Sequence, residues 1–354
     1  MRKGLGIMLV GFIAFSLLVA GCNSKPAAAP AAAPATAPPA APKELPKFRI
    51  MVGGMEKIIY LPAKLTEVLG YFKDEGVTVE LSNEAAGQNA EEALLAGELE
   101  AVVGFYDHNI DLQSKGKKTV DVCIFGGSPG ETLVVSNKAK DKIKSIADLK
   151  GATIGVTGLG SSTNFLANYL VVRGGNKQSD YKPLAVGAGQ TLITAMEQGN
   201  IVAAVTTEPT VSLLLKKNDA FVLVDMRDAK NTAAALGGTY PASSLYMMQD
   251  YVQKNPEVTQ KVVNAFVKTL RWINTHTPEE IAAKLPVDYY GGDKDMYLTA
   301  LKASLPMFTT DGKMPPEGPA TVLNVLSTFN KEMDPKKTDL KATYTDTFVD
   351  KVPK

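Results

Sequence analysis

The sequence predicts an α/β protein of two lobes with a ligand cleft between them, and three observations support this. From about residue 47 onward, short β-rich runs alternate with amphipathic stretches, which is the pattern of strands covered by helices. The chain has 354 residues, more than one ordinary domain needs. Finally, strands in both halves end in polar residues, and ligands of open α/β sheets bind beyond the carboxyl ends of strands.

The overall composition excludes several classes of protein. Apolar residues make up 45% of the chain and charged residues 21%, with a formal net charge of +1. Such an apolar fraction is that of a globular protein and excludes disorder of the whole chain. Near-neutral charge argues against a nucleic-acid or acidic-lipid partner, which would require a basic surface.

The N-terminus has the features of a secretory signal. Arg2 and Lys3 precede an apolar run over residues 4–20, and the segment ends in Val19-Ala-Gly-Cys22. A basic start, an apolar run and small residues before a cut site predict a signal peptide over residues 1–21. The alternative is a permanent membrane helix, for which the run has the bare minimum length. The last four residues resemble the bacterial lipobox, which implies that Cys22 is acylated and anchors the chain to the membrane.

A stalk is expected to follow the lipidated cysteine, over residues 22–46. Residues 26–42 are almost wholly Pro and Ala and cannot bury a core. As polyproline II they would reach ~50 Å at ~3.1 Å per residue. Removing the signal takes Arg2 and Lys3 away and leaves 36 basic and 37 acidic residues. Cys123 is then the single cysteine of the folded part, so we expect neither a disulfide nor a cysteine metal cluster.

Strands and helices are expected in order along the folded part. The first set of strands is Phe48–Val52, Val77–Leu81, Ala101–Phe105, Val120–Phe125 and Thr132–Ser136, with helical stretches such as Ile59–Tyr71 and Ala90–Ala96 between them. The second set is Thr153–Val156, Pro183–Val186, Val202–Thr206 and Phe221–Val224. This alternation predicts α/β layers with mostly parallel strands.

The last third of the chain is expected to be helical. Asn255-Pro256-Glu257 is typical of a helix start, and Glu280 is placed to complete a capping box with Thr277. Segments from Asp293 and from Pro316 also have helical patterns. This tail has no sheet of its own and must therefore pack on an existing lobe.

One internal similarity links the two sets of strands. Residues 97–103 (GELEAVV) are similar to residues 199–205 (GNIVAAV), and each segment follows a helical stretch. Duplication is one explanation. The other needs only two similar lobes, each of which ends a strand in polar residues.

Four segments resemble the solute-binding proteins of ABC importers of the nitrate/sulfonate/taurine type: Tyr71–Glu80, Ile146–Val156, Gly158–Thr163 and Glu208-Pro209. The resemblance spans residues 47–331 and implies a two-lobed, type II periplasmic-binding-protein-like fold. Lobe one would hold residues 47–137 and 246–354, and lobe two residues 138–245. Crossings near residues 136–138 and 243–247 would form the hinge.

The Gly/Ser-rich turn of residues 157–163 follows a predicted strand and opens a predicted helix over residues 164–173. Free N–H groups at a helix start attract anions, and three hydroxyls add donors. The alternative is an ordinary turn with a serine cap. The resemblance implies that this turn holds the sulfonate or carboxylate of the ligand. The candidate residues are Gly160, Ser161, Ser162 and Thr163.

The matching turn of lobe one contains Gly53, Gly54 and Met55, and Tyr60 follows it. Glycine permits close approach of backbone to a ligand, and Tyr60 could present a ring and a hydroxyl. The alternative is that Met55 and Tyr60 are core residues.

Tyr106-Asp107-His108 follows a strand and is the most distinctive tripeptide. No Gly-x-Ser-x-Gly nucleophile motif accompanies it, and the only other histidine, His276, offers no metal-site spacing. We therefore interpret these residues as hydrogen-bonding groups for a ligand. The alternative is a helix N-cap at Asp107.

Further polar residues lie near predicted strand ends. Glu131 and Thr132 enter the first expected crossing, and Glu208 lies in the facing lobe. A buried carboxylate beside an anionic ligand would be unfavourable, so these acids either face solvent or meet a ligand that also carries a cation. Arg227 could clamp a carboxylate or sulfonate, or it could be a solvated surface residue.

The resemblance implies a lipid-anchored receptor that passes a small anionic or zwitterionic solute to a permease and ATPase after hinge closure. It would lie at the bacterial cell membrane, facing the periplasm or the outer surface, as a monomer without cofactor or metal. A heteroaromatic or aromatic acid, as in thiamine-pyrimidine precursor uptake, is the alternative ligand. An enzyme on the same fold is less favoured, because the thiamine-pyrimidine synthases share a Cys-rich motif that is missing here. A sensory lipoprotein or adhesin that binds a ligand without a transporter is a third class of function, and no feature of the sequence separates it from the receptor.

Overall fold

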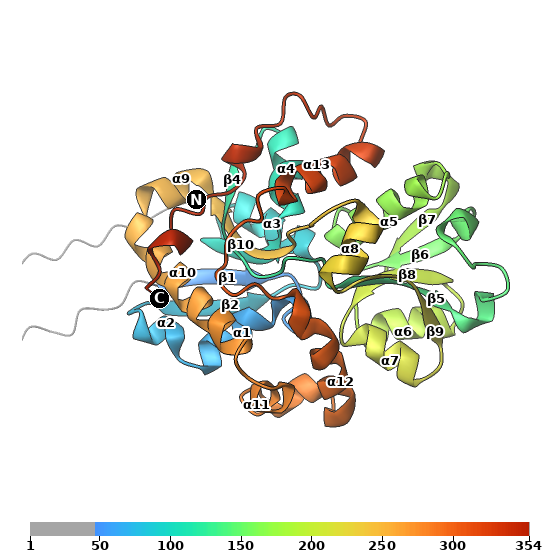
Figure 1. The fold of residues 1–354 in the computed structure, drawn as a ribbon, viewed down its shortest axis with the longest axis horizontal. Coiled ribbons are helices and arrows are strands. Elements are labelled where there is room, and N and C mark those ends of the chain that lie inside the picture. Colours follow the sequence, from blue (N-terminus) through green and yellow to red (C-terminus); the bar gives the residue numbers. More distant parts are fainter. Residues whose placement is uncertain (1–46, 354) are drawn as a thin grey trace, which may run out of the picture. The chain divides into compact units, whose positions relative to one another are not determined.

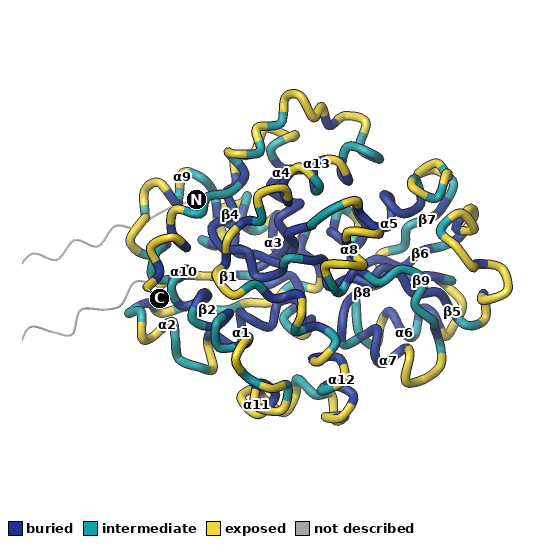
Figure 2. Tube along the Cα trace, viewed as in Figure 1, coloured by how far each residue is buried: buried dark blue, intermediate teal, exposed yellow. Residues whose placement is uncertain are grey.

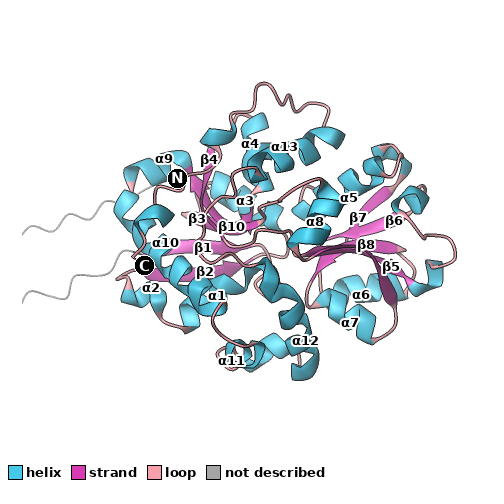
Figure 3. Cartoon of the chain, in the orientation of Figure 1, coloured by secondary structure: helices cyan, strands magenta, loops and turns pink. Residues whose placement is uncertain are grey.

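The structure is a computed structural model that describes residues 47–353. The expected signal peptide, Cys22 and the Pro/Ala-rich stalk lie outside the described residues. The described residues belong to one compact unit of the chain. They form two five-stranded sheets with helices on both faces, which we call lobe one and lobe two (Figures 1 and 3).

The first sheet contains five strands in the order β2-β1-β3-β10-β4. β1 pairs in parallel with β2 and β3, whereas β10 is antiparallel to both β3 and β4. The strands are β1 (Lys47–Val52), β2 (Thr78–Asn83), β3 (Ala101–Phe105), β4 (Thr119–Ile124) and β10 (Ser243–Met248).

The second sheet repeats this topology in the order β7-β6-β8-β5-β9. β6 is parallel to β7 and β8, and β5 is antiparallel to β8 and β9. The expectation of mostly parallel strands is therefore confirmed, with one reversed strand in each sheet. The strands are β5 (Glu131–Ser136), β6 (Thr153–Val156), β7 (Lys182–Ala185), β8 (Ala203–Thr207) and β9 (Ala220–Met226).

Both reversed strands enter their sheet directly from a crossing between the lobes, and this corrects the expected boundaries. β5 was expected in lobe one but pairs with β8 and β9 in lobe two. The first crossing therefore runs over residues 125–130, ahead of β5. β10 pairs along its length with lobe one, so the second crossing precedes residue 243. We propose residues 47–125 and 243–353 as lobe one and residues 131–236 as lobe two.

The internal similarity between residues 97–103 and 199–205 corresponds to equivalent places in the two sheets. Gly97 and Gly199 both adopt left-handed backbone angles, with φ of 77° and 76°. The strands that follow, β3 and β8, both occupy the third position of their sheet. The two lobes therefore share a local turn-and-strand design.

The helices of lobe one lie on both faces of its sheet, with α1, α2 and α10 packed together on one of them (Figure 1). α10 buries Val262, Phe266 and Leu270 at helical spacing, and the Phe266 ring lies 5.3 Å from Phe72 and 4.8 Å from Phe125. The α-helices are α1 (Leu61–Val68), α2 (Tyr71–Asp74), α3 (Gly87–Leu95), α4 (Asp107–Ser114), α9 (Gln249–Lys254), α10 (Pro256–Ile273), α11 (Pro278–Ala282), α12 (Lys294–Ser304) and α13 (Gly318–Phe329). The 3-10 helices are η1 (Ile58–Tyr60), η5 (Val287–Tyr290), η6 (Leu305–Met307), η7 (Leu340–Ala342) and η8 (Val349–Lys351).

Lobe two has α5 and α8 on one face of its sheet and α6 and α7 on the other (Figure 1). Strands in both lobes are largely buried, while the outer sides of the helices are exposed (Figure 2). The helices are α5 (Ser162–Arg173), α6 (Gln190–Glu197), α7 (Thr210–Lys216) and α8 (Ala229–Leu236), with 3-10 helices η2 (Asn137–Ala139), η3 (Ile146–Leu149) and η4 (Gln178–Asp180).

The helical tail packs on lobe one as expected, and it also touches lobe two. The capping box between Thr277 and Glu280 is formed, and Asp293 caps α12 with its side chain. α12 contacts α7, and α13 contacts α5. The tail therefore helps to join the lobes. Within residues 47–353, no helix combines the length and the apolar character that a membrane crossing requires.

Candidate functional site: a buried polar cluster between the lobes

The two lobes touch directly around the predicted site. The Ile58 N–H donates a hydrogen bond of 3.0 Å to the Glu208 carbonyl of lobe two. The ring of Phe165 on α5 lies 5.8 Å from His108 and 5.9 Å from Phe329, both in lobe one. Between these contacts lies a group of buried ionisable side chains, which we call the polar cluster. Its members are Lys57, Tyr60, Glu91, Asp107, His108, Glu131, Ser162 and Tyr240.

The topology explains why strand ends from both lobes contribute to the polar cluster. Ser243, at the start of β10, pairs with Phe105, the last residue of β3. In lobe two, Glu131 at the start of β5 pairs with Thr207, the last residue of β8. The reversed strands thus begin where the parallel strands end, and their first residues reach the edge of the sheet at which ligands bind.

Lys57 is a member of the cluster that the sequence analysis missed. It is 4% exposed, and its Nζ donates to the carbonyls of Gly53 at 2.6 Å and Ala85 at 2.9 Å. Burial lowers the pKa of Lys57 to about 8, against the opposing effect of Glu56 and Glu131. Gly54 has a φ of 120°, and a Cβ there would lie 2.4 Å from Lys57 Cε. The predicted glycine turn therefore makes room for a lysine.

His108 is paired with a carboxylate and fully buried. Its Nδ1 lies 2.7 Å from Glu91 Oε2 on α3, while its Nε2 has no hydrogen-bond partner among the described residues. Burial alone would lower the pKa of His108, but Glu91, with help from Asp107 and Asp111, raises it to about 9. His108 is therefore an imidazolium at neutral pH.

Asp107 is the first residue of α4, whose N-cap is Tyr106, so the alternative of an N-cap at Asp107 is wrong. Its Oδ2 accepts a 3.0 Å hydrogen bond from the Tyr240 hydroxyl, and its Oδ1 has no partner among the described residues. Burial raises the pKa of Asp107 to about 6, although His108 acts in the opposite direction. Asp107 is thus mainly ionised at neutral pH.

The two predicted tyrosines have different surroundings. Tyr60 is both a core residue, packed edge-on to Phe105 at 6.2 Å, and a neighbour of the cluster. Burial raises its pKa, and the charges of Glu131 and Asp107 raise it further. Tyr106 instead shares a 2.5 Å hydrogen bond with the Thr343 hydroxyl. Its hydroxyl therefore holds the C-terminal segment of lobe one rather than the cluster.

Glu131 is the acid that lobe two contributes to the polar cluster. It is completely buried; its Oε1 accepts a 2.9 Å hydrogen bond from Ser162, and its Oε2 has no partner among the described residues. Burial raises the pKa of Glu131 to about 8, and Asp107 adds to the rise while Lys57 and His108 oppose it. At neutral pH this carboxyl is mostly protonated and can donate a hydrogen bond.

The Gly/Ser turn before α5 is largely satisfied by its own side chains. The Thr163 hydroxyl lies 2.7 Å from Ser161 Oγ and 2.9 Å from Thr157 Oγ1. The Gly160 N–H donates to Asn164 Oδ1 at 3.0 Å, and the Gly158 N–H donates to Ser161 Oγ at 3.3 Å. The Gly160 N–H and the hydroxyls of Ser161 and Thr163, which are some of the expected anion donors, are therefore engaged within the turn. Ser162 is the hydroxyl of this turn that reaches the polar cluster, through Glu131.

Thr132, Glu208 and Arg227 lie on the opposite side of the lobe-two sheet from Glu131. Successive residues of a strand point to opposite faces, so Thr132 points away from Glu131. Glu208 accepts a 2.9 Å hydrogen bond from the N–H of Ser212 on α7, whereas Glu131 bonds to α5 on the other face. Arg227 donates to Glu208 and to Asp225, each at 2.6 Å. The guanidinium is therefore paired inside lobe two, in contrast to the expected ligand clamp or solvated residue.

Several buried polar atoms at this interface have no hydrogen-bond partner within residues 47–353. Buried polar groups are normally bonded, so these atoms mark the place where a solute with complementary groups would fit. They are Asp107 Oδ1, His108 Nε2, Glu131 Oε2, Thr207 Oγ1 and Ser243 Oγ. Thr132 Oγ1 and Thr206 Oγ1 also lack a partner among the described residues, but they lie on the other face of the lobe-two sheet. No group of three or more His, Cys, Asp or Glu side chains in the described chain is arranged to hold a metal ion.

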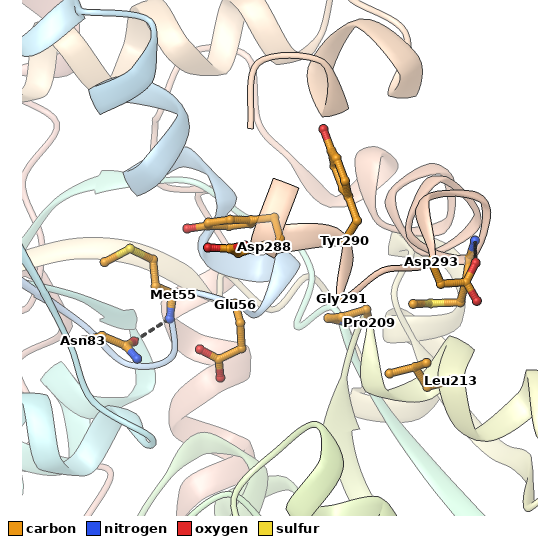
Figure 4. Close-up of a pocket in the computed structure, with 11 residues that line it drawn as sticks. Met55, Glu56, Asn83, Pro209, Leu213, Asp288, Tyr290, Gly291 and Asp293 are labelled. Atoms are coloured by element: carbon orange, nitrogen blue, oxygen red, sulfur yellow. Dashed lines mark hydrogen bonds between the residues drawn. The ribbon is translucent and has the colours of Figure 1, made fainter. Parts of the chain in front are cut away.

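Met55 lies outside the polar cluster, at a separate open pocket with a volume of about 450 Å³ (Figure 4). Its backbone N–H donates to Asn83 Oδ1 at 2.7 Å, which holds the turn after β1 against the end of β2. The residue is half-buried. The glycine turn thus presents Lys57 to the cluster and Met55 to the pocket.

Glu91 was also missed by the sequence analysis, although a signal for it exists. Gly87, Ala90, Glu91 and Leu94 are the buried residues of α3, and their spacing is that of one helix face. A carboxylate in that apolar row requires a partner, which is His108. Lys57 has a comparable signal: it is a charged residue that directly precedes the buried run Ile58–Leu61.

Two α/β lobes that enclose a buried polar cluster define the class of two-lobed periplasmic-binding-protein folds. The chain belongs to the NMT1-like family, whose model matches residues 45–287. It is similar to a structure from Bordetella bronchiseptica RB50, with 37% identity over 87% of this chain and 96% of that chain, and a TM-score of 0.83.

More distant structures share the fold. The periplasmic aliphatic sulphonate binding protein SsuA from Escherichia coli is 21% identical, covers 86% of this chain and 99% of its own, and has a TM-score of 0.64. The periplasmic nitrate-binding protein NrtA from Synechocystis PCC 6803 is 14% identical, covers 87% of this chain and 86% of its own, and has a TM-score of 0.66.

Curated relatives are similar at lower coverage. The putative binding protein YtlA of Bacillus subtilis is 21% identical over 69% of this chain and 72% of its own length. The 4-amino-5-hydroxymethyl-2-methylpyrimidine phosphate synthase THI13 of Saccharomyces cerevisiae is 24% identical over 60% of this chain and 63% of its own length. Both a binding protein and an enzyme are therefore among the relatives.

Proposed function

We propose that the chain is the extracytoplasmic solute-binding component of an ABC importer, which captures a small organic solute in the polar cluster by closure of its lobes. The observation that carries this proposal is the set of buried, unpartnered polar atoms that both lobes contribute to one place. Two structural neighbours are named as a sulphonate-binding and a nitrate-binding periplasmic protein, and this supports the transport role.

The charges of the polar cluster favour a zwitterion over a simple anion. Lys57 and His108 are cationic, Asp107 is anionic, and Glu131 is mostly a neutral donor, as their pKa values of about 8, 9, 6 and 8 indicate. A solute with an acidic group and an amino group would meet both signs of charge. An anion alone would leave Asp107 Oδ1 without a hydrogen-bond partner, which is costly for a buried group. Glu91, the other carboxylate of the cluster, is already paired with His108.

A heteroaromatic solute is the second candidate, and the yeast relatives favour it. A pyrimidine has ring acceptors and an exocyclic amino donor, which could pair with Glu131 and Asp107. We propose binding rather than catalysis for this chain, because the relative from Bacillus subtilis and the structural neighbours SsuA and NrtA are named as binding proteins.

The remaining expectations complete the proposal. Cys22 would be acylated and hold the protein at the bacterial membrane, on the periplasmic or outer face, with the Pro/Ala-rich segment as its stalk. The partners would be a permease and an ATPase, and the receptor would act as a monomer without a cofactor.

A thermal-shift panel with the purified full chain tests this proposal. The compounds are taurine and amino acids, alkanesulfonates, nitrate, simple carboxylates and aminopyrimidines. A solute at 100 times its Kd adds about 2.7 kcal/mol to the stability of the folded state, so one class should raise the melting temperature clearly. Zwitterions or aminopyrimidines are expected to raise the melting temperature. A panel in which no compound shifts the melting temperature would contradict the proposal, and a shift by nitrate alone would contradict the ligand chemistry.

A further inference from the structure

The open pocket at Met55 lies beside the lobe interface and is lined by both lobes (Figure 4). Lobe one supplies the turn after β1 and the segment from η5 into α12, and lobe two supplies the start of α7. The pocket of about 450 Å³ is large enough for a small organic molecule. Its lining residues are Met55, Glu56, Asn83, Pro209, Leu213, Asp288, Tyr289, Tyr290, Gly291, Asp293 and Met296.

The pocket is separate from the polar cluster. None of its lining residues belongs to the polar cluster. The side chain of Lys57 donates to the carbonyls of Gly53 and Ala85. A ligand of the pocket would therefore meet a different set of groups from a solute in the cluster.

The charge of the pocket is negative. Glu56 and Asp288 are exposed at its rim. Of the nearby lysines, Lys216 pairs with Asp293 and Lys64 pairs with Glu67, and Lys294 sets one positive charge against the two carboxylates of Glu56 and Asp288. An anion would therefore be repelled at this rim, whereas a cation would be attracted.

The walls of the pocket are apolar and aromatic. Met55, Leu213 and Met296 provide aliphatic and thioether surface, and Tyr289 and Tyr290 add aromatic surface. The buried hydroxyl of Tyr289 has no hydrogen-bond partner among the described residues. Burial raises the pKa of Tyr289, and the negative charges of Glu67 and Glu56 add to the rise.

A cation already interacts with this aromatic wall. The Nζ of Lys294 lies 5.9 Å from the centroid of the Tyr290 ring, within the range of cation–π attraction. The Tyr290 hydroxyl points away from the pocket and donates to the Ala282 carbonyl. The ring is thus held in place with the Lys294 ammonium over it.

We propose that this pocket is a second ligand site, which takes a small organic cation with an apolar or aromatic body. The acidic rim pairs with the charged group, and the apolar walls bury the body. Because Pro209 and Leu213 come from lobe two, the cation binds best when the lobes are together. If the polar cluster binds a solute by closure, as proposed above, each ligand raises the affinity for the other by the same factor.

The test uses 2-phenylethylammonium as the probe and 2-phenylethanol as its neutral analogue, titrated into the full chain by calorimetry at pH 7. The ammonium compound should bind at least ten times more tightly than the alcohol. The double variant Glu56→Gln/Asp288→Asn should weaken its binding at least tenfold. The control Glu257→Gln/Glu332→Gln, which removes the same charge from exposed positions elsewhere, should leave it unchanged.

A further variant, Leu213→Lys, places a cation in the lobe-two wall and should abolish binding of the amine. The proposal is overturned if the wild-type chain fails to bind the amine at millimolar concentration, or if the Glu56/Asp288 double variant binds as well as the control. It is also overturned if His108→Gln abolishes binding, because the amine would then occupy the polar cluster. None of these outcomes depends on whether a solute for the cluster is found.

Discussion

Two buried residues, Glu131 and His108, have protonation states that differ from those of their exposed counterparts at neutral pH. Burial keeps the Glu131 carboxyl neutral, with a pKa of about 8. The Glu91 carboxylate keeps the His108 imidazole charged, with a pKa of about 9. The interface thus presents a neutral acid and a charged base side by side, which is the basis of the proposed solute chemistry.

Replacing Glu131 with Gln should change the pH dependence of stability. Because the folded pKa of about 8 lies above the unfolded value of about 4.3, this group contributes stability that is complete below pH ~4.3 and is lost as the pH rises through 8. The wild type should therefore lose stability relative to Glu131→Gln, by up to about 1.4 kcal/mol per pH unit within that range. Urea unfolding between pH 4.5 and 8.5 measures the difference.

Glu257→Gln, an exposed substitution on α10, provides the control for Glu131→Gln. It should follow the wild-type pH dependence throughout. A constant difference between wild type and Glu131→Gln at every pH would contradict the neutral state assigned to Glu131.

NMR titration should show the high pKa of His108 directly. Its ring proton signals should titrate near pH 9, and Glu91→Gln should move this transition to lower pH, because burial then acts against the charged form without the carboxylate that opposes it. The chain has two histidines, so His276→Gln assigns the signals. A His108 transition that stays in place in Glu91→Gln would contradict the pairing.

The sequence located about half of the polar cluster. Asp107, His108 and Ser162 follow strand ends and could be found from that position alone. Lys57 and Glu91 belong to no motif, and their only signal is a charged residue beside or within an apolar pattern, which does not show which group each one meets in the fold. Arg227 was expected as a possible clamp, but the two carboxylates that occupy it are visible only in the fold.

In the turn of residues 157–163, local hydrogen bonds favour the ordinary turn that was the alternative to an anion site. Its hydroxyls bond to one another and to its own backbone, so it stabilises the start of α5 by local hydrogen bonds. The glycines and serines that suggested an anion site also allow the polar groups of a turn to hydrogen-bond to one another. A single sequence does not separate the two uses.

Thr163→Val should therefore lower the stability of the fold without changing the effect of anions on that stability. It removes the acceptor of the Thr157 N–H, which is 3.0 Å away, and leaves two buried hydroxyls short of a partner, at a cost of about 1–3 kcal/mol. Thermal unfolding with and without 50 mM sulfate measures both effects. If sulfate stabilises the wild type but not Thr163→Val, this turn binds anions after all.

At the scale of the whole molecule, the sequence predicted the two sheets but not where the chain changes lobe. The β-rich runs of nine strands were recognised, whereas β10 was expected only as a crossing, because it opens with Ser243 and Ser244. The first boundary was placed after β5 because β4 and β5 are close in sequence. Pairing between distant segments, such as β5 with β9, decides the boundary, and no local pattern reports it.

Contacts between the lobes should influence how far they open. Lys216 of lobe two pairs with Asp293 of lobe one, whereas its neighbour Lys217 pairs with Glu197 within lobe two. Lys216→Glu should therefore favour more open arrangements and increase the radius of gyration in X-ray scattering at low salt. The effect should be small, because the Lys216 side chain is 58% exposed and that of Asp293 is 34% exposed, and it should fade at high salt.

Lys217→Glu is the matched control for Lys216→Glu and should leave the radius of gyration unchanged. Equal increases in both variants would show that net charge, rather than the pair between the lobes, controls the opening.

The central claim is that the polar cluster binds the solute, and calorimetric titration of the most stabilising panel compound tests it most directly. The compound is titrated into the wild type, His108→Gln and the exposed-site control Glu257→Gln. Both the wild type and the control should bind with the same Kd, and His108→Gln should bind at least ten times more weakly. Equal affinity in His108→Gln and the wild type would place the solute elsewhere and contradict the account.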